Sequence, residues 1–177
     1  MPAFSALEVA LICFVLLAAV TDLASRKISN VLVLSGLLSA LVLRLQAGAD
    51  ASLPAWLGGM LTGFFVLLPL YLMRGMAAGD VKLMAMVGSF TGPLLALQIC
   101  FATFLIGGVM ALLIVLVKRR LRDALHNMQF LLSHVLLRAI GIPVVPMALT
   151  PGSSVGGMPY GLAIALGTLL LLGWRHA

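Results

Sequence analysis

The sequence predicts an all-α membrane protein, a polytopic bundle of about six transmembrane helices that forms one membrane-embedded domain over residues 1–177. Hydrophobic residues make up 63% of the chain and charged residues only 9%, whereas a soluble globular domain carries about 25% charged residues. Apolar runs recur along the chain, several of them close to the ~20 residues that one helical crossing requires. This composition excludes a water-soluble globular protein, and 177 residues leave no room for a soluble domain beside the bundle.

The first half of the chain contains three apolar runs that polar or basic segments separate. We expect the first crossing over residues 4–21, the second over 31–45 and the third over 56–73. The third run contains the spacing Gly59-x-x-x-Gly63, which lets two membrane helices approach closely because neither glycine has a side chain.

The apolar segment 83–117 is too long for one crossing. A single helix of this length would extend ~52 Å at 1.5 Å per residue, well beyond a hydrocarbon core of ~30 Å. We therefore expect two crossings with a turn at 91–93, of which the first, 81–90, is short. Either the turn falls later, near Gln98, or the short helix starts in a thinned, wet part of the protein. Both alternatives place Asp80 at a helix start that water can reach.

The last third of the chain contains three segments of different composition. Residues 118–139 combine a basic, polar face with apolar residues at helical spacing, which indicates an amphipathic helix lying in the membrane interface. Residues 142–157 hold three prolines and several glycines, so we expect a loop. Pro159 suits the first turn of a last crossing over 160–172.

The distribution of basic residues predicts the topology. Most Lys and Arg residues, nine of the eleven, fall after the first, third or fifth expected crossing: Arg26, Lys27, Arg74, Lys82, Lys118, Arg119, Arg120, Arg122 and Arg138. The positive-inside rule places these segments in the cytoplasm and both termini on the other side. The positive-inside rule also accounts for the net charge of +6, so the charge does not indicate nucleic-acid binding. Asp22 and Asp80 then lie at the same, cytoplasmic, membrane face.

Asp22 and Asp80 are the candidate functional residues, because an ionisable side chain at membrane depth costs ~3 kcal/mol or more and is rarely kept without a function. Each also has a structural interpretation. Asp80 could cap the helix that we expect to begin at Val81, and Asp22 could pair with Arg26 at i+4. Their common face and the small residues before Asp80 favour a shared functional site.

Two carboxyl groups a few Å apart do not both ionise readily, so such a pair shares one proton. That state suits the cleavage of a peptide bond by water: the ionised carboxylate takes a proton from water while the protonated partner binds the carbonyl oxygen. The sequence offers neither a Ser/His/Asp constellation nor clustered metal ligands. We therefore expect no metal and no cofactor.

Three stretches resemble motifs of the type IV prepilin peptidases. Residues 22–30, Asp-x-x-x-Arg-Lys-Ile-Ser-Asn, are similar to the motif around the family's first aspartate. Residues 77–83, Ala-Ala-Gly-Asp-Val-Lys-Leu, resemble its Gly-x-Gly-Asp motif. Residues 158–165, Met-Pro-Tyr-Gly-Leu-Ala-Ile-Ala, are similar to the start of the last helix in the short, Tad-type members.

The resemblance implies an aspartic peptidase of the bacterial cytoplasmic (inner) membrane that removes the basic leader of prepilins and pseudopilins. Asp22 and Asp80 match the two catalytic aspartates. The residues expected to support the site are Gly79, Lys82, Arg26, Asn30, Pro159 and Gly161. The chain has no Cys-x-x-Cys pair, which the longer relatives with N-methyltransferase activity carry, so we expect cleavage without methylation.

The sequence departs from the family pattern at two positions. Ala77 stands where the first glycine of Gly-x-Gly-Asp is usual, and Ser29 stands where proline is usual. Neither change removes a reacting group. Ala77 does raise the question of how the backbone bends there, because Gly permits positive φ and Ala resists it.

Three functional hypotheses follow from these observations. The first is a membrane aspartic endopeptidase that acts on type IV or Flp-type prepilins and pseudopilins. The second is a small proton- or cation-coupled transporter that uses the same carboxylates. The third is a non-enzymatic pilus assembly factor. The sequence identifies the lipid bilayer as a partner and leaves the oligomeric state open.

Overall fold

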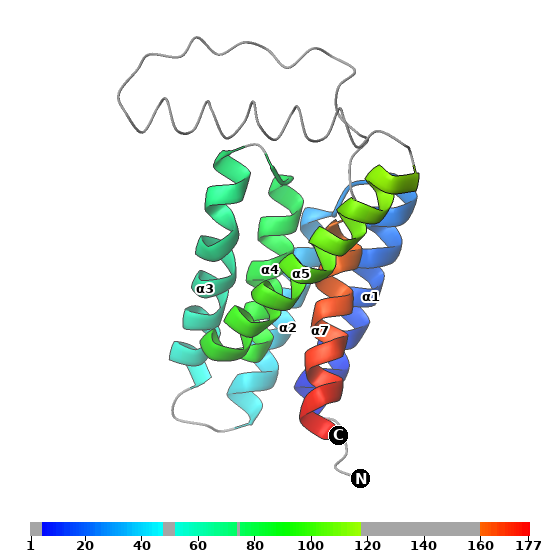
Figure 1. Ribbon diagram of the computed structural model, residues 1–177. Helices are drawn as coiled ribbons and strands as arrows, with labels where there is room; N and C mark the ends of the chain where they lie inside the picture. The colour runs from blue at the N-terminus through cyan, green and yellow to red at the C-terminus, as the bar shows by residue number, and fades with distance from the viewer. Residues whose placement is uncertain (1–4, 48–51, 74, 118–159) are drawn as a thin grey trace, which may run out of the picture. The chain divides into compact units, whose positions relative to one another are not determined.

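The computed structural model describes residues 5–47, 52–73, 75–117 and 160–177, which form six α-helices and no strand. The helices are α1 (Ala6–Ser25), α2 (Asn30–Gln46), α3 (Ser52–Leu72), α4 (Ala78–Thr91), α5 (Pro93–Val117) and α7 (Tyr160–His176) (Figure 1). The all-α prediction is confirmed for this part of the chain. The predicted amphipathic helix 118–139 and loop 142–157 lie outside the described residues.

The chain divides into two compact units, Met1–Gly108 with Pro159–Ala177, and Val109–Met158. The first unit contains both aspartates and nearly all the described residues. Within it α1 packs against α7 and α2, and α3 packs against α2 and α4 (Figure 1). The single domain predicted over residues 1–177 stays a prediction.

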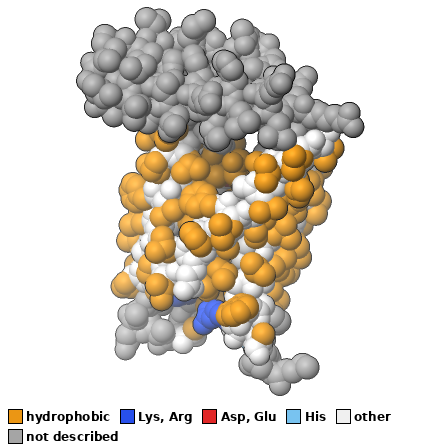
Figure 2. All heavy atoms as spheres, viewed as in Figure 1, with side chains coloured by type: hydrophobic (Ala, Val, Ile, Leu, Met, Phe, Trp, Pro, Cys, Tyr) orange, Lys and Arg blue, Asp and Glu red, His pale blue; other side chains and the backbone are white. Residues whose placement is uncertain are grey.

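Three helices are long and apolar enough to cross a membrane: Ala6–Ser25, Leu53–Leu72 and Pro93–Ile114. The helix Asn30–Gln46 is apolar but shorter. Large hydrophobic side chains also cover the outer surface (Figure 2), among them Leu16, Phe65 and Phe101. An exposed apolar surface of this kind is what lipid requires, so this is a membrane protein. The count of six crossings stays a prediction.

Helix α4 forms the centre of the first unit. It contacts α1, α2, α3 and α7, and every residue from Asp80 to Phe90 except Lys82 is buried. The close approach predicted for the glycines of α3 is confirmed: a Cβ atom at Gly59 would overlap the carbonyl of Gly88, and one at Gly63 the carbonyl of Met84. Backbone packs directly on backbone along this contact, so α3 closely covers one side of α4.

The two ends of α4 test the predicted boundaries. The turn is confirmed at Gly92, whose φ of 82° suits glycine, and α5 starts at the next residue, so the alternative turn near Gln98 is wrong. The predicted start at Val81 is also wrong, because the helix begins three residues earlier, at Ala78. Asp80 therefore lies inside the first turn of α4 and not in front of it.

Arg44 of α2 holds the other end of α4. Its Nε donates to the carbonyl of Ser89 at 2.9 Å, and its Nη2 donates to the carbonyl of Phe90 at 2.8 Å. The last carbonyls of a helix have no partner within the helix and carry partial negative charge. Arg44 lies near the end of the second predicted crossing, and in the fold it caps a buried helix.

Cys13 and Cys100 each lie inside an apolar run without the spacing of metal ligands, which predicts that both are small core residues. Cys100 on α5 is buried, as predicted, whereas Cys13 on α1 is exposed, so the core interpretation is wrong there. Cys13 lies on an exposed side of α1, which lipid covers in a membrane. Lipid is as apolar as a protein core, so a run of apolar residues alone does not distinguish these two surroundings.

We predict that Arg44→Met destabilises the fold by about 1–3 kcal/mol, since it leaves two helix-terminal carbonyls without donors. Unfolding of the purified protein by denaturing detergent, followed by circular dichroism, measures the change. Lys27→Met, which removes an exposed cation between α1 and α2, is the matched control and should leave the midpoint unchanged. Equal midpoints for the two variants would show that the Arg44 cap does not contribute.

Candidate active site

Asp22 lies in the last turns of α1 and is buried, with 7% of its surface exposed. Its Oδ2 accepts a hydrogen bond of 2.8 Å from the backbone N–H of Gly161. Gly161 is the second residue of α7, and the first N–H groups of a helix have no partner within the helix and attract negative charge. The N-terminus of α7 thus holds the carboxylate of α1 in place.

Gly161 leaves no room for a side chain. A Cβ atom added there would lie 2.8 Å from Oδ2 of Asp22 and 3.0 Å from its Cβ. A glycine in a membrane helix is expected to serve close helix packing. In the structure Asp22 itself packs on Gly161. The N–H of Gly161 reaches the carboxylate because no side chain stands between them.

Asp80 lies at the third position of α4 and is also buried, with 5% of its surface exposed. Its Oδ2 accepts a hydrogen bond of 3.2 Å from the backbone N–H of Ala77, the residue that precedes the helix. Ala77 has φ −81° and ψ 151°, an extended conformation that any L-residue adopts. Alanine in place of the family's glycine therefore causes no backbone strain at this position.

The two carboxyl groups belong to helices that pack against each other, α1 and α4, and they interact electrostatically. Each accepts one backbone N–H, from Gly161 or Ala77, near the start of a helix. The fold thus brings together two buried acids that are 58 positions apart in the sequence, and orients both with main-chain donors. Main-chain donors suit this task because the backbone of a packed helix cannot rotate away.

Tyr160, the first residue of α7, is part of the same cluster and was missed by the sequence reasoning. It is half-buried and lies near enough to Asp80 for its hydroxyl to be influenced by the charge of that carboxylate. The available signal was its place directly before Gly161 in the Met-Pro-Tyr-Gly stretch, since a residue adjacent to one that contacts Asp22 also lies near the pair. Pro159, the residue before it, lies outside the described residues.

The other residues that were expected to support the site lie around this cluster. Gly79 packs on the side chain of Ile28, and a Cβ atom added to Gly79 would lie 3.3 Å from the Cβ of Ile28. Arg26 ends α1 in the left-handed conformation, φ 53°, and its N–H donates to the carbonyl of Asp22.

Lys82 and Asn30 form a separate polar contact. Lys82 Nζ donates to Asn30 Oδ1 at 3.0 Å, and both side chains are exposed. Lys82 is exposed whereas Asp80 is buried, as expected for two residues two positions apart in one helix. This contact joins the start of α2 to the first half of α4. In the described ranges no three His, Cys, Asp or Glu side chains are grouped so that they could hold a metal ion.

Residues 9–116 match the model of the type IV leader peptidase family. The chain belongs to this family. The matched segment includes both aspartates and covers more than half of the chain, but it ends before α7. Comparisons with curated proteins and with solved structures gave no match. Membership makes the protein a peptidase of prepilin leaders, and the fold adds α7, which supplies the N–H that holds Asp22.

We predict that Gly161→Ala lowers leader cleavage at least about tenfold, because the methyl group displaces the Asp22 carboxylate from a hydrogen bond to a charged acceptor, an interaction of about 1.5–3 kcal/mol. The measurement is the rate of prepilin cleavage by the purified variant in proteoliposomes. Gly173→Ala is the matched control on the same helix, because a Cβ atom there meets nothing within 4 Å. Equal rates for the two variants would contradict the role of Gly161.

Proposed function

We propose that this leader peptidase is an aspartic endopeptidase in which Asp22 and Asp80 together activate water. The observation that carries the proposal is the pair of buried carboxyl groups from α1 and α4, which interact electrostatically and are each held by a backbone N–H. Two buried acids that interact electrostatically are the arrangement that shares a proton.

In the proposed reaction the ionised carboxylate takes a proton from a water molecule, and the oxygen of that water attacks the carbonyl carbon of the scissile peptide. The protonated carboxyl group donates a hydrogen bond to the carbonyl oxygen and stabilises the negative charge that develops there. The C–N bond then breaks as the leaving nitrogen receives a proton from the pair. The pair ends with one proton, as it began, and it titrates as a unit.

The short length of α4 supports access of water to this pair. Fourteen residues extend only ~21 Å, less than the ~30 Å of a hydrocarbon core. A helix of this length leaves at least one of its ends below the level of the membrane surface or close to it. Water and a membrane-anchored substrate can then both reach Asp80, which lies in the first turn of α4.

We place the aspartate pair at the cytoplasmic face of the bacterial inner membrane. The basic residues Arg26 and Lys27 directly follow the last turn of α1, near Asp22, and the positive-inside rule assigns such residues to the cytoplasm. At the opposite end of the same unit, His176 Nε2 and Glu8 Oε1 lie 3.2 Å apart. The start of α1 and the end of α7 therefore share one end of the unit, which supports both termini on the non-cytoplasmic side.

The proposed substrates are type IV or Flp-type prepilins and pseudopilins with short basic leaders. We further propose that the enzyme cleaves without methylating the new N-terminus, since the sequence contains only Cys13 and Cys100 and no Cys-x-x-Cys pair.

The test of the aspartate pair uses Asp22→Asn and Asp80→Asn. Each should lower prepilin cleavage by about 10²–10⁴-fold, the usual contribution of a general acid or base, because an amide can neither take up nor release the proton. Cleavage is measured in proteoliposomes that contain the variant and a prepilin, by the shift in product mass. Asp50→Asn, in the segment between the second and third predicted crossings, is the control and should cleave at the normal rate.

Wild-type rates in either variant would exclude the two-aspartate mechanism. An Asp80-dependent flux of protons or cations, with no cleavage of any prepilin, would favour a transporter. Retention of pilus assembly in both variants in cells would favour a non-enzymatic assembly factor.

A further inference from the structure

Two adjoining cavities open on the side of the first unit that α5 and α7 form. The larger, about 810 Å³, is an apolar groove, and the smaller, about 240 Å³, is lined by charged as well as apolar residues. Leu95 and Arg175 line both cavities, so the two meet at these residues. We propose that together they bind one anionic phospholipid, with the acyl chain in the groove and the headgroup phosphate at Arg175 and Arg44.

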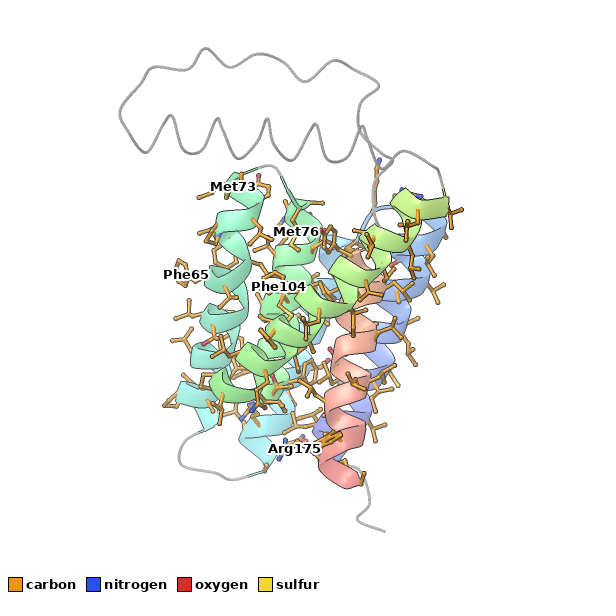
Figure 3. All side chains as sticks on the ribbon, viewed as in Figure 1. Phe65, Met73, Met76, Phe104 and Arg175 are labelled. Atoms are coloured by element: carbon orange, nitrogen blue, oxygen red, sulfur yellow. The ribbon has the colours of Figure 1, made fainter. Side chains whose placement is uncertain are left out.

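The apolar groove suits an acyl chain. Phe101, Phe104 and Leu105 of α5 line it on one side, and Leu170 and Leu171 of α7 line it on the other. Phe104 lies part of the way along α5 and Arg175 lies near the end of α7 (Figure 3). The groove therefore leads from an apolar wall to a guanidinium group, which is the pattern of an amphiphile with a charged head.

The smaller cavity has an excess of positive charge. It is lined by Arg44, Arg175 and one carboxylate, Glu8. Glu8 is already engaged, since Oε2 accepts from the N–H and the hydroxyl of Ser5, and Oε1 contacts His176. Within the described part of the chain, neither guanidinium lies within ion-pair distance of a carboxylate.

The two arginines can both serve a phosphate. Arg44 uses Nε and Nη2 for neutral carbonyl acceptors, which leaves its charge uncompensated and the Nη1 donors for a ligand. A guanidinium has five N–H donors in a planar fork that matches phosphate oxygens. On the visible face of the described residues, Figure 2 shows a basic patch near the lower end of an otherwise mainly apolar surface.

Charge complementarity selects an anionic lipid over a zwitterionic one. The ammonium group of a zwitterionic headgroup would need a carboxylate partner, and Glu8 is the carboxylate of this cavity and is occupied. A glycerol headgroup carries no ammonium group and needs no carboxylate partner. Trp174, exposed beside Arg175, has the amphipathic ring that suits the headgroup level of a bilayer, which places the charged end of the site at the membrane surface.

This site is separate from the proposed active site. Glu8 and Asp22 are fourteen positions apart on α1, a distance of ~21 Å along a helix axis. Loss of the lipid site should therefore leave the chemistry at Asp22 and Asp80 intact, and a failed lipid experiment would not bear on the peptidase mechanism.

The test is native mass spectrometry of the purified, delipidated protein titrated with phosphatidylglycerol or with phosphatidylcholine of the same acyl chains. We expect one phosphatidylglycerol to bind at least about tenfold more tightly than phosphatidylcholine. Arg175→Gln should remove this preference, since it removes a charge-assisted contact to phosphate. Leu105→Trp, which adds bulk at an exposed position in the groove, should weaken binding of both lipids about equally.

Lys27→Gln is the matched control, because it removes an exposed cation that follows the opposite end of α1 from Glu8. It should leave the preference for phosphatidylglycerol unchanged. Arg175→Lys should keep part of the preference. Equal binding of the two lipids by the wild type would overturn the proposal. So would an unchanged preference in Arg175→Gln, or a loss in Lys27→Gln as large as that in Arg175→Gln.

Discussion

The arrangement of the first unit depends on one constraint, the satisfaction of the backbone at both ends of the short central helix α4. A helix end in an apolar environment cannot leave its N–H or C=O groups without partners. At the N-terminal end the Asp80 carboxylate accepts the N–H of Ala77, and at the C-terminal end Arg44 donates to the carbonyls of Ser89 and Phe90. A catalytic candidate and a structural arginine thus stabilise the same helix from opposite ends.

The burial of α4 also explains how two acids can be held close together. Gly59 and Gly63 bring the backbone of α3 against that of α4, while α1 and α7 cover other parts of α4. Because α7 presents an N–H through a residue without a side chain, Asp22 is oriented by main chain. The free-energy cost of burying each carboxylate is offset in part by a hydrogen bond from a backbone N–H that the packed helix holds in place.

Local signals in the sequence predicted much of this accurately. Apolar runs located the helices, and the length of 83–117 together with Gly92 and Pro93 located the turn between α4 and α5. The sequence predicts a start of α4 at Val81, three residues late, because aspartate is a favoured cap residue, whereas Asp80 lies at the third position of the helix. The apolar run around Cys13 predicts a core position, although Cys13 is exposed, because lipid and protein surroundings select the same side chains.

What the sequence by itself determined is the class of the protein, the approximate positions of its helices, and the two aspartates as the costly polar groups in an apolar chain. Only the tertiary structure decided which main-chain donors these carboxylates receive, that Tyr160 belongs with them, and that Arg44 reaches α4. The reason is physical: periodicity and composition report on a residue's own surroundings, whereas hydrogen bonds between residues as far as 168 positions apart depend on how helices pack.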